Sequence, residues 1–186
     1  MTGKRAGQSS AKKGGAVGAA LVGILMGSDS DLPIMEEVAS ALDQLQVGFE
    51  MRICSAHRSP ENAAQYARDA EGRGLKVLIA GAGAAAHLAG ALAAHTILPV
   101  VGVPLSSSPL QGLDALLATV QMPSGVPVAT MALDQAGARN AAMFAAQILA
   151  LHDPDLARRL KACKEKMAKR VQEKDRQLQR RKEKKA

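Results

Sequence analysis

The stretch LVGILMGSDSDLPIMEEVASALDQL, residues 21–45, contains one complete strand-and-helix unit. Its first seven residues are apolar or glycine, which predicts a buried strand. A polar turn follows, Pro33 stands near the start of the next segment, and Met35, Val38 and Leu42 recur at helical spacing. We therefore expect a strand that leads through a short turn into an amphipathic helix.

The same alternation of strand and helix patterns occurs five times along the chain. Further strands are expected in residues 47–56, 75–83, 98–105 and 126–133, and further helices in residues 59–74, 84–96, 113–122 and 136–152. Continuous apolar strands separated by helices predict a parallel sheet covered on both faces. With right-handed crossovers this is an α/β fold, a three-layer αβα sandwich around five parallel strands. Ligands of such sheets bind outside the carboxyl ends of the strands.

The charge of the chain is unevenly distributed. Residues 1–13 carry four basic and no acidic side chains, residues 14–152 carry 6 basic and 11 acidic, and residues 153–186 carry 14 basic and 6 acidic. A nucleic-acid-binding fold spreads positive charge over its folded face, whereas here the net charge of +7 arises from the ends. We predict a flexible basic arm (1–20), an α/β domain (21–152) and a basic C-terminal helix and tail (153–186).

The basic C-terminal segment also carries an apolar stripe. Leu156, Leu160, Cys163, Met167 and Val171 recur every three or four residues, which favours an extra helix that packs on its own domain or on a neighbouring subunit. Binding of nucleic acid is not expected, because no aromatic residue is present there to stack on bases.

The composition narrows the class of protein. Hydrophobic residues make up 47% of the chain but aromatic residues only 2%, so small aliphatic side chains must build the core, and subunit contacts are expected to add to its stability. Cys54 and Cys163 show no CxxC spacing and indicate free thiols of a reducing compartment.

No apolar run reaches the roughly 18 residues of a membrane span, and glycine and alanine interrupt the apolar N-terminal stretch, unlike in a signal peptide. We expect a cytoplasmic protein.

The motif MGSDSD, residues 26–31, ends the first expected strand. Backbone N–H groups at a helix start and the Ser28 hydroxyl suit a phosphate, while an aspartate such as Asp31 can accept hydrogen bonds from ribose hydroxyls. The alternative is N-capping of the helix by Ser or Asp.

The motif SAHRSP, residues 55–60, ends the second strand. Arg58 can bind a phosphate through two hydrogen bonds, and His57 can carry a proton, because histidine changes its charge near neutral pH. The alternative is a surface His–Arg pair in a loop.

The motif AGAGAAAHLAG, residues 80–90, ends the third strand. Gly81 and Gly83 allow the backbone to approach a ligand, and His87 is either a site residue or a structural histidine. The third glycine and the acidic residue of a dinucleotide-binding motif are missing. Three serines follow the fourth strand without a nucleophile elbow, and the four histidines show no metal-ligand spacing. Together, the strand ends predict one shared small-molecule site.

These motifs, with LPVVGVP (98–104) and VQMPSGVPV (120–128), resemble those of the phosphoribosylaminoimidazole carboxylase catalytic-subunit family of purine synthesis, over about residues 21–151. The resemblance implies a flavodoxin-like sheet, a homo-octamer, and no metal or organic cofactor. It implies that His57 is catalytic and that Ser28, Asp31 and Arg58 hold a ribotide substrate. We also expect Ser55, Gly83 and His87 to contact that substrate.

The resemblance implies an isomerase that moves a carboxylate from the exocyclic nitrogen of an aminoimidazole ribotide to ring carbon four. The SAHR form of the motif resembles the branch of the family that uses this carbamate substrate. The alternatives are direct carboxylation of the ribotide by carbon dioxide, typical of SAHK, or a ribotide-binding protein without catalysis. This chain has Ala84 and Ala129 where the family usually has glycine, and Ala89 where it has proline. A methyl group at Ala84 is unfavourable if this residue needs positive φ.

Overall fold

A computed structural model describes residues 19–183 of the chain. The arm predicted for residues 1–20 lies almost entirely outside the described residues. The chain divides into two compact units, one up to Ala145 and one from Ala146 onward. The boundaries that we predicted at residues 20 and 152 stay predictions.

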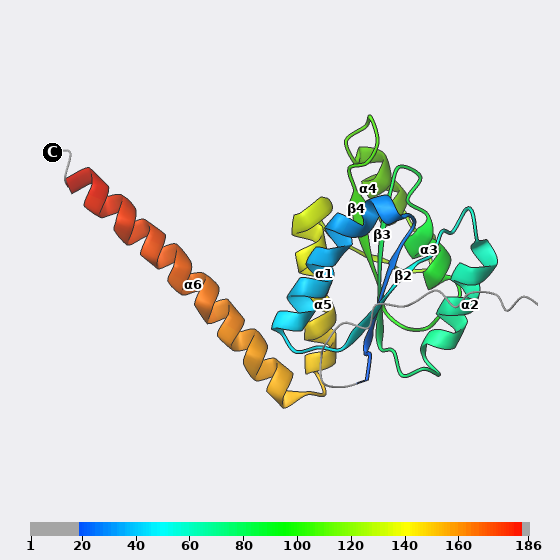
Figure 1. Cartoon of the computed structure of the whole chain (residues 1–186), viewed down its shortest axis with the longest axis horizontal. Coiled ribbons are helices and arrows are strands. Elements are labelled where there is room, and N and C mark those ends of the chain that lie inside the picture. Colours follow the sequence, from blue (N-terminus) through cyan, green and yellow to red (C-terminus); the bar gives the residue numbers. More distant parts are fainter. Residues whose placement is uncertain (1–18, 184–186) are drawn as a thin grey trace, which may run out of the picture. The chain divides into compact units, whose positions relative to one another are not determined.

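Five parallel strands form one sheet in the order β2-β1-β3-β4-β5 (Figure 1). They are β1 (Val22–Met26), β2 (Phe49–Ile53), β3 (Val77–Gly83), β4 (Val100–Leu105) and β5 (Ala129–Thr130). This is the flavodoxin-like order, so the predicted fold class is confirmed.

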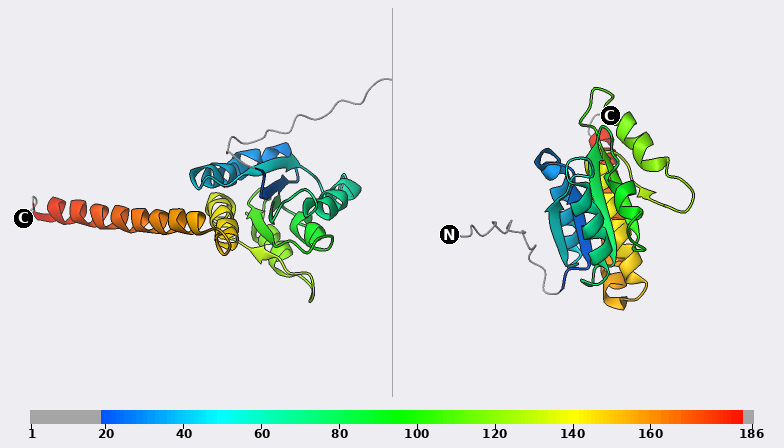
Figure 2. Two further views of the ribbon diagram at one scale, coloured as in Figure 1. Left: turned by 90° about the horizontal axis from the view of Figure 1, so that it is seen from below. Right: turned by 90° about the vertical axis from the view of Figure 1, so that its right-hand side faces the viewer.

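The helices alternate with the strands along the chain, and the last helix follows the sheet. The helices are η1, a 3-10 turn (Asp29–Asp31), α1 (Leu32–Gln44), α2 (Pro60–Ala70), α3 (Leu88–Ala93), α4 (Leu113–Val120), α5 (Asp134–Ala150) and α6 (Pro154–Glu183). Figures 1 and 2 show α1 and the part of α5 up to Ala145 on one side of the sheet, and α2 and α3 on the other. The three layers of the predicted sandwich are therefore present.

The core is built from small and aliphatic side chains. Every residue of β1 and β4 is buried, as expected for parallel strands between two helical layers. The predicted apolar stripe of α1 buries Met35, Val38 and Leu42. A side chain at Gly81 would collide with Met35, so this glycine of β3 allows α1 to pack closely on the sheet.

Several elements are shorter than the sequence predicted, among them β2 and α2, and the fifth strand and the third helix are shortened most. The fifth strand has two residues instead of eight, because Pro127 has no N–H group with which to extend the ladder at this sheet edge. The third helix begins at Leu88, not at residue 84, because Ala84 has a left-handed backbone with φ 51°. Helix propensity of the alanine run is overridden by this loop.

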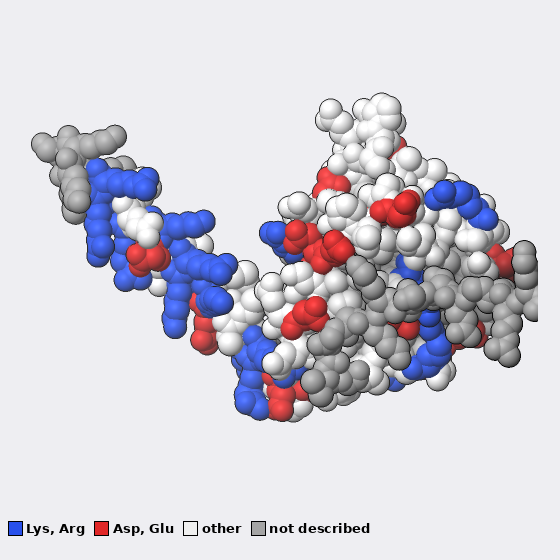
Figure 3. Space-filling view, in the orientation of Figure 1, with Lys and Arg blue, Asp and Glu red and all other residues white. Residues whose placement is uncertain are grey.

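Helix α6 forms most of the second unit. Leu156 and Leu160 are buried, whereas Met167, Val171 and Leu178 are 48%, 68% and 52% exposed. Lys and Arg side chains cover much of α6 in Figure 3, and acidic side chains gather on the visible face of the first unit. Among the described helices, none is long and apolar enough to cross a membrane.

Candidate active site

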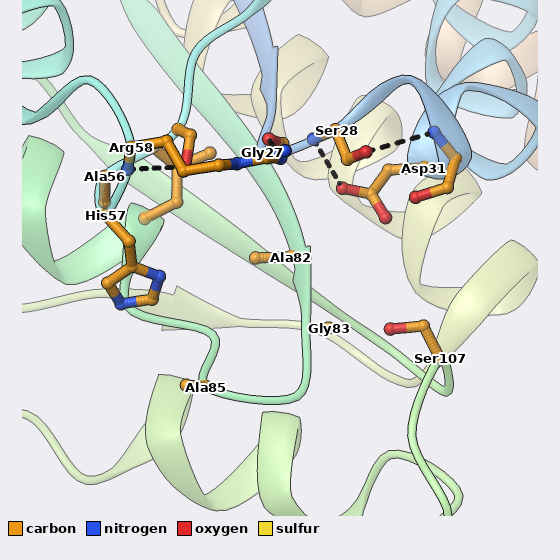
Figure 4. A pocket seen from close by; sticks show the side chains of 13 residues that line it. Gly27, Ser28, Asp31, Ala56, His57, Arg58, Ala82, Gly83, Ala85 and Ser107 are labelled. Atoms are coloured by element: carbon orange, nitrogen blue, oxygen red, sulfur yellow. Dashed lines mark hydrogen bonds between the residues drawn. The ribbon is translucent and has the colours of Figure 1, made fainter.

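A cavity of about 360 Å³ lies at the carboxyl ends of the strands. The chain leaves β1 to form β2 on one side and returns to form β3 on the other, and this reversal of strand order is where such sheets bind ligands. The lining residues come from the ends of four strands: Gly27, Ser28, Ser30, Asp31, Ser55, Ala56, His57, Arg58, Ala82, Gly83, Ala85, Leu88 and Ser107. Figure 4 shows their arrangement.

The β1 end of the cavity is a capping box. The Ser28 backbone N–H donates to Asp31 Oδ2 at 3.0 Å, and the Ser30 N–H donates to Ser28 Oγ at 3.4 Å. N-capping, the alternative that the sequence left open, is therefore present. A carboxylate has two acceptor oxygens, so capping by Asp31 leaves acceptor capacity for a ligand.

Asp31 is a buried acid, with 7% of its surface exposed. Burial raises the pKa of Asp31 above its ordinary value; the hydrogen bond from the Ser28 N–H and the positive charge of Arg58 act in the opposite direction without offsetting it. The folded protein therefore holds this carboxylate in an environment that disfavours its charge.

The loop after β2 presents His57 and Arg58 to the cavity. The Ser55 hydroxyl accepts from the Arg58 backbone N–H at 3.1 Å, which holds the turn. The Arg58 Nη2 group donates to the Gly27 carbonyl at 2.9 Å, so its guanidinium lies against the end of β1 (Figure 4). The remaining N–H groups of the guanidinium can bind an anion beside Ser28.

The two histidines of the predicted site contact each other. His57 Nε2 and His87 Nδ1 are 2.8 Å apart, and the rings meet edge to face with their centroids 5.0 Å apart. This bond orients the His57 imidazole. His87 itself is not among the residues that line the cavity.

The β3 end forms an apolar wall of small residues. Ala82, Gly83, Ala85 and Leu88 line the cavity here. A side chain at Gly83 would collide with the Ser107 hydroxyl, so glycine is required where β3 and the loop after β4 meet. Gly81, by contrast, lies under Met35 and contributes to helix packing.

The structure thus brings together six of the seven residues expected at the site, all except His87: Ser28, Asp31, Ser55, His57, Arg58 and Gly83. The prediction did not select Ser107, because the sequence has three consecutive serines with nothing to distinguish them. Among the side chains of residues 19–181, no three His, Cys, Asp or Glu are placed to hold a metal ion.

The sequence model of one family, described as AIR carboxylase, matches residues 21–170. The chain belongs to the AIR carboxylase family. This match covers the whole sheet and all the residues that line the cavity.

Relatives of this AIR carboxylase family member include curated enzymes and solved structures. The N5-carboxyaminoimidazole ribonucleotide mutase of Pyrococcus abyssi is 55% identical, over 81% of this chain and 86% of its own. The mutase of Bacillus subtilis is 52% identical, over 85% of this chain and 98% of its own. The crystal structure of Treponema denticola PurE has a TM-score of 0.78 at 31% identity, and the match covers 86% of this chain and 98% of that one.

Replacing Ala84 with glycine should stabilise this AIR carboxylase family member. Ala84 has φ 51°, and relief of that strain, less the greater freedom of unfolded glycine, should raise the free energy of unfolding by about 0.5–1 kcal/mol. Urea denaturation measures the change. Ala85→Gly, the neighbouring residue without positive φ, is the matched control and should lower stability. Equal losses in both variants would contradict the prediction.

The variant Asp31→Asn should be more stable than the wild type, and this difference should grow as the pH rises. Burial raises the pKa of Asp31, so the folded wild type holds its proton more tightly than the unfolded chain and loses stability as the pH rises through that pKa. Asparagine can still accept from the Ser28 N–H and carries no charge. The advantage of Asp31→Asn in urea denaturation should be small at about pH 3 and larger at neutral pH. An advantage that is greatest in acid would contradict this expectation.

Proposed function

We propose that this protein is an N5-carboxyaminoimidazole ribonucleotide mutase, a cytoplasmic isomerase of purine synthesis. Curated relatives at 52% and 55% identity carry that name. The observation that carries the proposal is the convergence of His57 and Arg58 with the Ser28–Asp31 turn in one cavity with an apolar wall. A proton carrier, an anion site and an apolar compartment are the three parts that this reaction needs.

The polar end of the cavity suits the ribose phosphate of the substrate. Arg58 lies against Gly27, and its remaining N–H groups can donate to phosphate oxygens. The Ser28 hydroxyl donates to Asp29 Oδ1 at 3.0 Å, and by exchanging that acceptor it can donate to the phosphate as well. Asp31 then accepts from a ribose hydroxyl. This binding mode places the aminoimidazole ring toward His57 and the small residues of the β3 end.

In the proposed reaction, one histidine moves one proton out and back. Protonated His57 gives its proton to the carbamate nitrogen, the nitrogen–carbon bond breaks, and carbon dioxide leaves the electron-rich aminoimidazole. Ring carbon four then attacks the carbon dioxide and forms the new carbon–carbon bond. The neutral His57 takes the proton from ring carbon four, which restores the aromatic ring and returns His57 to its starting state.

Carbon dioxide must remain beside the ring between these two steps. Ala82, Gly83, Ala85 and Leu88 supply an apolar wall, which offers an uncharged gas no hydrogen-bond partner except the reacting groups. Confinement replaces a reaction with dissolved gas by a reaction inside one cavity, which raises its effective concentration.

Replacing His57 with asparagine should abolish conversion. We expect the wild type to convert N5-carboxyaminoimidazole ribonucleotide to the ring-carboxylated product without added bicarbonate, and His57→Asn to be about 10²–10⁴-fold slower. His95→Asn, a change of an exposed histidine outside the cavity, is the matched control and should match the wild type. The product is measured by its ultraviolet absorbance.

Direct carboxylation is the second candidate, because the family is described by that reaction. A wild type that ignores the carbamate but carboxylates aminoimidazole ribotide at high bicarbonate would establish it. Ribotide binding without either conversion would indicate a binding protein.

We also propose that the chain assembles into a homo-octamer. On α4, Leu113, Leu117 and Val120 are 56%, 46% and 53% exposed, and their spacing places them on one face of the helix. Leu110 and Ile97 are also exposed, by 63% and 86%. Exposed apolar side chains along one helix face favour contact with another copy of the chain.

Replacing Leu117 with glutamate should reduce the assembly mass. A charge on the apolar face of α4 would have to be buried in the subunit contact, which is strongly unfavourable. Light scattering after size exclusion should give an octamer for the wild type and smaller species for Leu117→Glu. Asn62→Glu adds the same charge at an exposed polar position of α2 and should leave the mass unchanged. An unchanged mass in both variants would exclude this face.

A further inference from the structure

The three serines after β4 have different hydrogen-bond partners. The Ser106 N–H and hydroxyl donate to Asp134 Oδ1 and Oδ2 at 2.9 and 2.6 Å. The Ser108 hydroxyl accepts from the Leu110 N–H at 3.1 Å. Ser107 lines the cavity, and among residues 19–181 its hydroxyl has no hydrogen-bond partner. Ser107 is therefore the serine that is available to a ligand.

Asp134 is held in an unusual conformation. It is the first residue of α5 and has φ 53°, a left-handed backbone that is uncommon outside glycine but tolerated by aspartate. Both oxygens of its carboxylate accept from Ser106, and hydrogen bonds to a charged group are stronger than those between neutral groups. The start of α5 is thereby tied to the end of β4.

This tie constrains the residue that follows. Ser106 stands between Leu105, the last residue of β4, and Ser107, so fixing its N–H and hydroxyl limits the path of the chain at Ser107. The Ser107 hydroxyl occupies the space where a side chain of Gly83 would lie. In Figure 4, Ser107 faces the cavity from the side opposite His57 and Arg58.

We propose that Ser107 is a substrate-contacting residue of the proposed reaction and that Asp134, acting through Ser106, is its positioning residue. The inference rests on the proposed mutase function. Ser107 lies beside the apolar wall of Gly83 and Ala85, where the transferring carboxylate is held. Its hydroxyl donates a hydrogen bond to that carboxylate and orients it toward ring carbon four.

The test compares Asp134→Gly, Ser107→Ala and the double variant in the full-length protein. Glycine adopts positive φ without strain, so Asp134→Gly should fold and lose only the two bonds to Ser106. We expect kcat to fall about 10-fold in each single variant, with KM changed less than about 2-fold, because the lost bond acts on the transferring group. In the Asp134→Gly background, Ser107→Ala should have an additional effect below about 2-fold.

Two variants separate positioning from a general structural effect. Asp134→Asn tolerates positive φ and keeps one acceptor oxygen, so it should retain most of the wild-type kcat. Gln46→Gly changes another left-handed residue, with φ 56°, in the turn between α1 and β2 at the opposite edge of the sheet. It should leave kcat and KM unchanged.

The outcomes separate this inference from the proposed function. If the wild type is active, either of two results would overturn the positioning role. One is that Asp134→Gly has the same kcat and KM as the wild type. The other is that Ser107→Ala causes a full additional 10-fold loss of kcat in the Asp134→Gly background. An inactive wild type would refute the mutase proposal instead. In that case hydrogen exchange decides: at least about 10-fold faster exchange of the Ser106 and Ser107 amides in Asp134→Gly supports the tie, and equal rates overturn it.

Discussion

The parallel register of β1 with both of its neighbours is the constraint on which the rest of the site depends. Met26 pairs with Ile53 of β2 and with Gly81 of β3, and the Cys54 N–H extends this ladder to the Met26 carbonyl at 2.7 Å. Neighbouring strands lie about 4.8 Å apart, so the loops that follow β1, β2 and β3 must leave the sheet side by side. Three segments with different chemistry, a Ser–Asp turn, a His–Arg loop and a small apolar loop, therefore share one cavity.

Small side chains explain how closely the helices pack on the sheet. Ala63, Ala67 and Ala70 of α2 and Ala141, Ala142 and Ala145 of α5 are buried with almost no exposed surface. Alanine on a helix lets the backbone approach the sheet closely, and Gly81 does the same for Met35 from the side of the strand. The result is a core of little aromatic content, and a cavity whose apolar wall is made from the same small residues. Each such residue buries little area, which makes contact between subunits a natural further source of stability.

The cavity concentrates features that oppose stability. Burial disfavours the charge of Asp31, and Ala84 and Asp134 have left-handed backbones at its margin. Proteins tolerate strain of this kind where the surrounding structure determines the conformation, and it is common at functional sites. At Asp134 the compensation is visible, because both carboxylate oxygens accept from Ser106. At Ala84, no comparable side-chain bond is available, since alanine has no polar side chain.

The sequence by itself determined the fold class and which side chains stand at the strand ends that meet. It could do so because alternation, helix spacing and the capping turn of Ser28 are local patterns that reflect local contacts. Only the tertiary structure decided that Ser107 faces the cavity while Ser106 binds Asp134. It also decided that His87 contacts His57 and does not line the cavity, and that Gly81 allows close helix packing. It also shortened the fifth strand and the third helix. These features join residues that are far apart in the sequence, or they depend on loop dihedral angles. Nothing in the local sequence distinguishes Ser106 from Ser107, because both are serines in the same loop. Only the register of the strands and the path of the loops place each of them beside its own partner.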